Sequence, residues 1–414
     1  MENLFYDIIL GGKSNIRMSR VSIRNILTIR YDITKKPVIK PATMQDFEKS
    51  FSDPHGHLTE KLLNDSFKKI KKFDRFSVSL SGGIDSSLCL ALLRKNFPKA
   101  RISAISGVFE NTFDESMHAK KIAEKFDADF HPIQMESIYT KMPEIVYIAR
   151  KPRWNTYHHL IAKHAKKFSK ILVTGDGGDE LFGGYTFRYK KFLNLIKPKD
   201  TWKSKVIKYL ECHNRDWVPD QEFLFNKGIK FNWNEIYNYF KPYFKNQLHP
   251  LNQVMLADFN GKLLHDFIPT GNAVERYYKI ERFSPFLEEG VKPFALGLPL
   301  RSKYNAVADQ GKIVLRKINN RLNVKYVKGK HGFSPSLIFD WKKFGKDIFM
   351  ANAFEKKSNI YTKKIINRDW IIHALERIEN DGDIRYLNRI TSILALEIWY
   401  KIFIKKDLSP RNSL

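Results

Sequence analysis

A glycine-rich turn at residues 81–86 carries the strongest chemical signal in the sequence. It reads Ser-Gly-Gly-Ile-Asp-Ser, and it stands between an apolar run typical of a strand and a helical pattern. Glycines let a backbone approach a ligand closely, and the unpaired N–H groups at the start of a helix attract an anion. Because Asp85 would repel a lone phosphate, its expected role is to hold Mg²⁺ that bridges to phosphates. The turn lacks the Gly-Lys-Ser/Thr ending of a Walker A loop.

A second glycine-rich turn follows another short apolar run and carries three carboxylates. Residues 173–185 read VTGDGGDELFGGY, which places Asp176, Asp179 and Glu180 within five residues. Like charges in so tight a loop repel each other unless a cation or a proton compensates. A second Mg²⁺ ligand fits this need, and so does a carboxylate that acts as a general base. A solvated acidic turn is the alternative, and the apolar Leu-Phe pair in the loop disfavours it.

The elements that must position these turns follow from the apolar pattern around them. We expect strands at Phe76–Leu80, Ile102–Phe109 and Ile171–Thr174, and helices at Leu58–Lys72, Asp85–Leu93, Asp114–Phe126 and Asn155–Phe168. Strands that alternate with helices pair in parallel through right-handed crossovers. The sequence therefore predicts an α/β fold with a doubly wound parallel sheet, whose carboxyl edge binds the ligand.

The remaining sequence predicts a short N-terminal segment and a helical half. Residues 1–57 are poorly periodic, and the partial alternation of Val21–Tyr31 predicts one or two strands of a small β element. Beyond residue 185 the pattern is helical, and Leu387–Phe403 is a strongly apolar helix. We expect one domain over residues 58–405, with an α/β half at about 58–185, a helical half at about 186–405 and a tail at 406–414.

The two turns resemble those in the synthetase domain of asparagine synthetase-like enzymes, which are of the ATP-pyrophosphatase type. Further similar segments follow in order: GKIVLR at Gly311–Arg316, KHGF at Lys330–Phe333 and LEIW at Leu396–Trp399. The resemblance covers about residues 58–405, and so many motifs in the right order are hard to assign to chance. It implies an adenine nucleotide alpha hydrolase-like sheet with added C-terminal helices.

The resemblance also implies roles for individual residues. The residues expected to bind ATP are Leu80, Ser81, Gly82, Gly83, Asp85, Ser86, Gly175 and Lys312. The residues expected to hold Mg²⁺ are Asp85 and Asp179. The residues expected to act in catalysis are Lys330 and Asp176. Lys312 would contact the β- and γ-phosphates. Lys330 would stabilise negative charge that develops during attack on the α-phosphate. For each lysine the alternative is a solvated surface side chain, because this region is rich in lysines.

The start of the chain departs from the glutamine-dependent members of the family. Their glutaminase domain begins at a catalytic cysteine after the initiator Met, whereas this chain begins MENLF and has its first cysteine at Cys89. Glutamine hydrolysis is therefore not expected. Nitrogen would come from ammonia, from another amine, or from a separate glutaminase or carrier partner.

The segment expected to bind the acceptor acid also departs from the family. Asp176 stands where asparagine synthetases have Glu, and Asn272-Ala273 replaces an Asp-Arg pair. The arginine of the Glu-x-Arg-x-Pro-Phe-Leu segment is shifted by one position, to Arg282. We therefore expect an acceptor pocket that differs from one built for aspartate.

The composition is strongly basic. The 414 residues carry a formal net charge of +28, and residues 301–368 hold 17 Lys and Arg against 4 Asp and Glu. This charge favours a polyanionic partner, although a solvated lysine-rich surface is the simpler interpretation.

Two cysteines outside any CxxC pair argue against a cysteine zinc site or a disulfide framework. Without a long apolar run or a signal peptide, a cytoplasmic protein with no membrane contact is expected.

Three functions follow from these observations. The leading hypothesis is an ATP-dependent ligase that adenylates a carboxylate, aspartate or a related acid, releases pyrophosphate and transfers ammonia or another amine to the acid. The second is modification of a tRNA or another nucleic acid by the same adenylation, which the basic charge favours and the GDGGDELFGGY loop disfavours. The third is a non-catalytic scaffold, which the retained Asp85, Asp179 and Lys330 disfavour.

Overall fold

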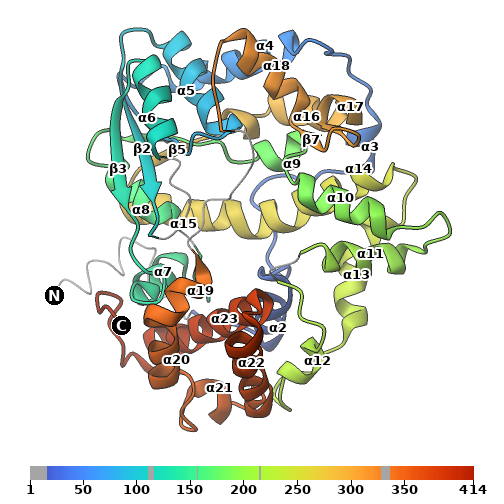
Figure 1. Ribbon diagram of the computed structural model, residues 1–414, viewed down its shortest axis with the longest axis vertical. Helices are drawn as coiled ribbons and strands as arrows, with labels where there is room; N and C mark the ends of the chain where they lie inside the picture. The colour runs from blue at the N-terminus through green and yellow to red at the C-terminus, as the bar shows by residue number, and fades with distance from the viewer. Residues whose placement is uncertain (1–15, 111–115, 156, 214–215, 328–335) are drawn as a thin grey trace.

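A parallel sheet of five strands organises one half of the molecule (Figure 1). The computed structural model describes residues 16–110, 116–155, 157–213, 216–327 and 336–414. The strands are β1 (Arg75–Ser79), β2 (Arg101–Val108), β3 (Asp129–Gln134), β4 (Ile171–Val173) and β5 (Glu281–Phe283). Their order is β3-β2-β1-β4-β5, and every neighbouring pair is parallel. This order confirms the doubly wound sheet.

The short strands at the centre of the sheet are buried on both faces. In β4, Ile171 and Val173 belong to one hydrophobic core and Leu172, between them, belongs to a second core. Successive side chains of a strand point to opposite faces, so an uninterrupted apolar run suits a strand covered on both sides. The β1–β4 pair aligns Val78 with Val173 and Ser77 with Leu172, and this register brings the ends of the two strands together.

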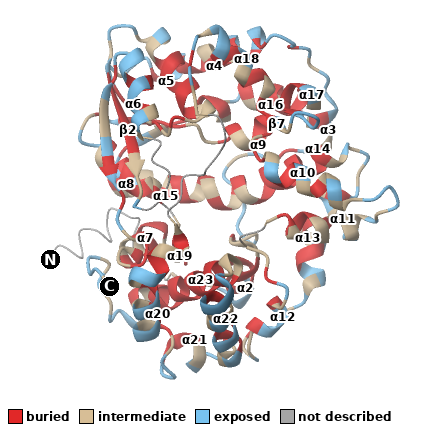
Figure 2. Cartoon of the chain, viewed as in Figure 1, coloured by how far each residue is buried: buried red, intermediate tan, exposed pale blue. Residues whose placement is uncertain are grey.

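The two hydrophobic cores lie on opposite faces of the sheet, and each contains several helices. The first core includes α5 (Ile84–Asn96), α14 (Pro250–Asp258) and α18 (Ile313–Arg321). The second includes α7 (Met142–Ala149), α8 (His158–Ala165), α22 (Arg368–Asp381) and α23 (Ile384–Tyr400). Figure 1 shows α22 and α23 at the end of the molecule opposite α5, with α15 (Ile268–Tyr278) crossing between the two ends. The helix α23 is buried along nearly its whole length (Figure 2).

The prediction of strands at Val21–Tyr31 is wrong, because this segment forms helix α2 (Arg20–Ile29). The Ser19 side chain caps the helix by accepting a hydrogen bond from the Ser22 backbone N–H. Ile23, Ile26 and Leu27 are buried at the three- and four-residue spacing of one helical face. The β-branched residues suggested a strand, but burial of this face favours the helix. No strand occurs in the described part of residues 1–57.

The expected division at residue 185 does not hold for the sheet, because β5 comes from the half expected to be helical. β5 has only three residues, which is too short to give a sequence pattern. The edge strand β3 was also not predicted, since it is partly exposed and contains Pro132.

Among the described residues, no helix combines the length and the hydropathy needed to cross a membrane.

Candidate functional site

The turn after β1 and the turn after β4 meet where the sheet changes direction. β2 and β3 lie on one side of β1, whereas β4 and β5 lie on the other. In doubly wound sheets such a switch point, at the carboxyl ends of the strands, forms the crevice that binds ligands. The two glycine-rich turns, about ninety residues apart in the sequence, thus face the same crevice.

The turn after β1 leads directly into helix α5. Gly82 has a φ of +75°, which favours glycine, and Gly83 is the N-cap residue. No side chain of the described residues caps the helix, and the backbone N–H groups of its first turn suit an anion. The Ser81 and Ser86 hydroxyls lie 3.2 Å apart and brace the turn from inside. Leu80 precedes these serines and is buried, and its backbone N–H donates to the carbonyl oxygen of Ile105 in strand β2.

Asp85, Asp179 and Lys312 form an ion cluster at the centre of the crevice. The Lys312 ammonium lies 2.7 Å from Asp179 Oδ1 and also bonds the Asp85 carboxylate. The lysine is the N-cap of α18, in a left-handed conformation with a φ of 58°. Burial acts to lower the pKa of Lys312, but the two carboxylates outweigh it and raise the pKa above its ordinary value. The cluster therefore joins three segments around one cation.

Glycines let the second turn close around these carboxylates. A Cβ on Gly175 would lie 2.8 Å from the Cβ of Asp85, and a Cβ on Gly178 would lie 2.7 Å from the Asp85 carboxylate carbon. A Cβ on Gly184 would lie 1.8 Å from Asp179 Oδ1. These positions have no space for a side chain unless the acidic residues move.

The Gly184→Ala substitution should therefore disrupt the ion cluster. The new methyl group would displace the carboxylate of Asp179, since it would also lie 2.6 Å from Lys312 Cε. We expect the ATP affinity, measured by calorimetry, to fall at least about tenfold, because a loss of about 1.4 kcal/mol in binding free energy already corresponds to a tenfold change. Gly290→Ala is the matched control, because among the described residues the nearest atom to its Cβ belongs to the Leu62 side chain, at 4.0 Å. Equal ATP affinity in the two variants would contradict this prediction.

Asp176 lies in a separate network with Arg282. Arg282 Nη1 lies 2.6 Å from Asp176 Oδ2, its Nε donates to Glu275, and its Nη2 donates to Asn272 Oδ1 at 3.2 Å. The Thr174 hydroxyl donates to the same Asp176 oxygen at 2.9 Å. Burial acts to raise the pKa of Asp176, but the charges of Arg282 and His158 lower the pKa below its ordinary value. Asp176 is thus held as a carboxylate, which suits a positioning or electrostatic role better than that of a base.

The third carboxylate of the loop has a different environment again. Glu180 is buried and accepts a hydrogen bond from the Tyr185 hydroxyl. Burial and the neighbouring charge of Asp179 raise the pKa of Glu180 to about 7. The three carboxylates of the acidic turn therefore differ: Asp176 pairs with an arginine, Asp179 pairs with a lysine, and the pKa of Glu180 is raised.

The Asp85–Asp179 pair fits a magnesium ion. Carboxylate oxygens from two loops already converge on one cation, the Lys312 ammonium. Mg²⁺ is usually held by one or two carboxylates, with substrate phosphates and water completing its shell. Among the described residues no cluster of three or more metal-binding side chains occurs.

Most of the residues expected from the sequence lie together in this crevice. The two turns and the start of α18 contain Leu80, Ser81, Gly82, Gly83, Asp85, Ser86, Gly175, Asp176, Asp179 and Lys312. Lys330 lies outside the described residues. The sequence did not predict that Arg282 pairs with Asp176, although the shifted position of this arginine was a visible signal.

Comparison with known proteins gives the family. The model of the asparagine synthase family matches residues 58–401. Because the match covers most of the chain, the protein belongs to the asparagine synthase family.

Three curated relatives are similar over different lengths. Asparagine synthetase [glutamine-hydrolyzing] 1 of Bacillus subtilis is 24% identical over 376 residues, which cover 80% of this chain and 57% of that protein. A putative asparagine synthetase [glutamine-hydrolyzing] of Mycobacterium tuberculosis is 23% identical over 387 residues, covering 85% of this chain and 58% of the relative. A putative asparagine synthetase of Methanocaldococcus jannaschii is 30% identical over 139 residues, covering 30% of this chain and 26% of the relative. The chain thus spans less than three-fifths of the length of the first two relatives.

Proposed function

We propose that the protein is an ATP-dependent ligase that activates a carboxylic acid as its adenylate and converts it into an amide. The observation that carries this proposal is the convergence of Asp85 and Asp179, from two turns at the switch point of the sheet, on one buried cation. The uncapped start of α5 lies beside this pair. A phosphate-binding turn next to a pair of acidic metal ligands suits a nucleoside triphosphate that carries Mg²⁺.

The proposed reaction has two steps. An oxygen of the substrate carboxylate attacks the α-phosphorus of ATP, the bond to the β-phosphate breaks, and pyrophosphate leaves. The amine nitrogen then attacks the acyl carbon, loses a proton, and AMP leaves with the former carboxylate oxygen. Ser81, Gly82 and the first turn of α5 bind the pyrophosphate, and Lys312 contacts its oxygens. Asp85 and Asp179 would hold Mg²⁺, which would neutralise charge on the phosphates when bound.

The acceptor acid is aspartate or a related acid, and Arg282 defines how its pocket differs from the family pattern. This arginine already pairs with Asp176 and Glu275, so its charge is largely neutralised before any substrate binds. An arginine held in this way positions Asp176 more readily than it recognises a free carboxylate. Ammonia or another amine, free or supplied by a partner, is the proposed nitrogen source.

The nucleotide products give a direct test of this function. The protein, ATP, Mg²⁺, ammonium and a panel of carboxylic acids are incubated, and the nucleotides are separated by chromatography. The proposal requires AMP and pyrophosphate that appear only with one class of acid. Formation of ADP and phosphate would reject adenylation, and AMP formed only with added tRNA would favour nucleic-acid modification instead.

Lys330 is proposed to stabilise the charge on the α-phosphate during attack. Loss of such a donor lowers a rate by roughly 10²–10³-fold. Lys330→Ala should therefore reduce kcat by about this factor while the KM for ATP changes much less, because other groups bind the ground state. Lys325→Ala, at an exposed lysine of the same segment, is the control and should be mild. Equal small effects in both variants would assign the segment to the solvated surface.

A further inference from the structure

Part of the strong positive charge of the chain lies where three distant segments meet. Helix α2 begins at Arg20, residues 225–230 follow helix α12 (Gln221–Leu224), and residues 363–367 follow helix α21 (Asn359–Thr362). Figure 1 shows α12 and α21 at the end of the molecule away from the sheet. The junction of these segments is therefore separate from the ATP crevice.

Hydrogen bonds of the main chain hold the three segments together. The Gly228 N–H donates to the Lys364 carbonyl oxygen at 2.7 Å, and the Gly228 carbonyl oxygen accepts a hydrogen bond from the Arg20 guanidinium. A Cβ on Gly228 would lie 2.8 Å from the Lys363 carbonyl oxygen, so glycine suits this close approach. The fold thus fixes the basic residues of the three segments side by side.

The LEIW segment of α23 supports the junction from inside. The buried Glu397 carboxylate accepts hydrogen bonds from the backbone N–H groups of Asn359 and Ile360, each at 3.0 Å, and from the Asn359 side chain at 2.8 Å. These bonds satisfy N–H groups at the start of α21. The lysines that follow α21 are exposed at its other end.

Five exposed cations surround the junction, and none of them forms an ion pair with a carboxylate of the described residues. They are Arg20, Lys227, Lys230, Lys363 and Lys364. Residues 16–21, 222–231 and 353–371, which contain them, hold nine Lys and Arg against three Asp and Glu. The excess of positive charge at this surface therefore remains after the neighbouring carboxylates are counted.

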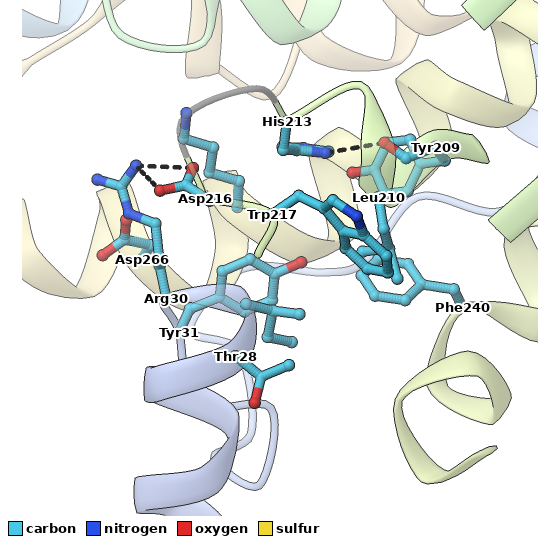
Figure 3. Close-up of a pocket in the computed structure, with 12 residues that line it drawn as sticks. Thr28, Arg30, Tyr31, Tyr209, Leu210, His213, Asp216, Trp217, Phe240 and Asp266 are labelled. Carbon is cyan, nitrogen blue, oxygen red and sulfur yellow. Dashed lines mark hydrogen bonds and ion pairs between the residues drawn. The ribbon is translucent and has the colours of Figure 1, made fainter. Parts of the chain in front are cut away.

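Two other arginines of α2 and its C-cap show the contrast. Arg24 pairs with Glu235, and Arg30 Nη1 lies 3.0 Å from both oxygens of Asp216, as the dashed lines in Figure 3 show. Arg20 instead donates to a backbone carbonyl oxygen, which does not cancel its charge.

We propose that these five cations form a binding surface for the phosphate backbone of a nucleic acid. Exposed cations gain affinity for a polyanion because its condensed counterions are released, and the formal charge of +28 attracts such a partner from a distance. The Phe223 ring in α12 is 64% exposed and offers a face on which a base can stack. The surface does not depend on the proposed ligase reaction, since none of the five cations belongs to the ATP crevice.

An anionic membrane fits this surface less well. In the three segments, Val21 and Phe223 are the exposed large hydrophobic side chains. Insertion into a membrane interface needs a continuous apolar face, which two such side chains do not provide.

The affinity for a short, labelled single-stranded RNA, measured by fluorescence anisotropy at several salt concentrations, tests the proposal with the full chain. The double variant Lys363→Gln, Lys364→Gln should bind about tenfold more weakly or worse. The slope of log affinity against log salt should become smaller by about 1.4, because each lost contact with a single strand removes about 0.7.

The matched control is the double variant Lys166→Gln, Lys167→Gln. It removes two adjacent exposed lysines at the end of α8 and changes the net charge equally. The control should bind the RNA as the unmodified protein does. Lys227→Gln with Lys230→Gln, on another segment of the surface, should weaken binding as the first double variant does, and it decides if that variant fails to fold.

Three outcomes would overturn the proposal. The first is the absence of saturable RNA binding at low salt. The second is equal weakening by the surface variants and the control, which would assign binding to the overall charge. The third is binding of phosphatidylserine vesicles or polyglutamate that the surface lysines control, without binding of RNA.

Discussion

Replacing Asp85 by Asn should abolish the Mg²⁺-dependent release of pyrophosphate from ATP. The substitution keeps the shape of the side chain but removes the charge that would hold the ion. Gly175 and Gly178 lie directly against the Asp85 side chain, so the amide of the variant occupies the same place. Loss of one electrostatic contact of this kind reduces rates by about 10²–10³-fold, and loss of a metal ligand should have at least this effect. Pyrophosphate release, measured with a coupled assay, gives the result.

The matched control for this variant is Asp127→Asn. Asp127 has a side chain that is 99% exposed, and its φ of 50° is one that Asn also adopts readily. The control should keep the activity of the unmodified protein, and both variants should give the same far-UV circular dichroism. Full activity of Asp85→Asn would remove Asp85 from the proposed metal site.

Replacing Lys312 by Met should destabilise the protein in a way that Mg²⁺ reverses. Without the ammonium, the Asp85 and Asp179 carboxylates lose the cation that they share in the structure. Removing one partner of a buried ion pair costs about 3–5 kcal/mol. A magnesium ion bound by both carboxylates would restore much of this stability. The free energy of unfolding, measured with urea in EDTA and again in MgCl₂, separates the two states.

Lys190→Met is the control for the lysine substitution. Lys190 is exposed and lies 3.8 Å from Asp309, so its removal should change the stability by no more than about 1 kcal/mol in either buffer. If Mg²⁺ stabilises Lys312→Met and the unmodified protein equally, the two carboxylates do not form the metal site that we propose.

Local patterns in the sequence predicted the central part of the fold. The strands at Phe76–Leu80, Ile102–Phe109 and Ile171–Thr174 are confirmed as β1, β2 and β4, with ends that differ by one residue. Most residues of these strands are buried, so the local pattern of each strand depends little on distant contacts. β3 and β5 escaped prediction, because they lie at the edges of the sheet, where a strand can be short or partly polar.

Contacts between distant segments could not be predicted from the sequence. Both glycine-rich turns were found because several functional groups lie within a few residues of each other. The pairing of Lys312 with Asp85 joins residues 227 positions apart, and that of Arg282 with Asp176 joins residues 106 apart.

The exchange of labelled pyrophosphate into ATP tests the central claim most directly. The reaction detects reversible formation of an acyl-adenylate and needs neither the amine nor the final product. We predict exchange that requires both Mg²⁺ and one class of carboxylic acid, that is lost in Asp85→Asn and that persists in Asp127→Asn. Failure of every acid in a broad panel to support exchange, with ATP bound and Mg²⁺ present, would contradict the assignment of this protein as a carboxylate-adenylating ligase.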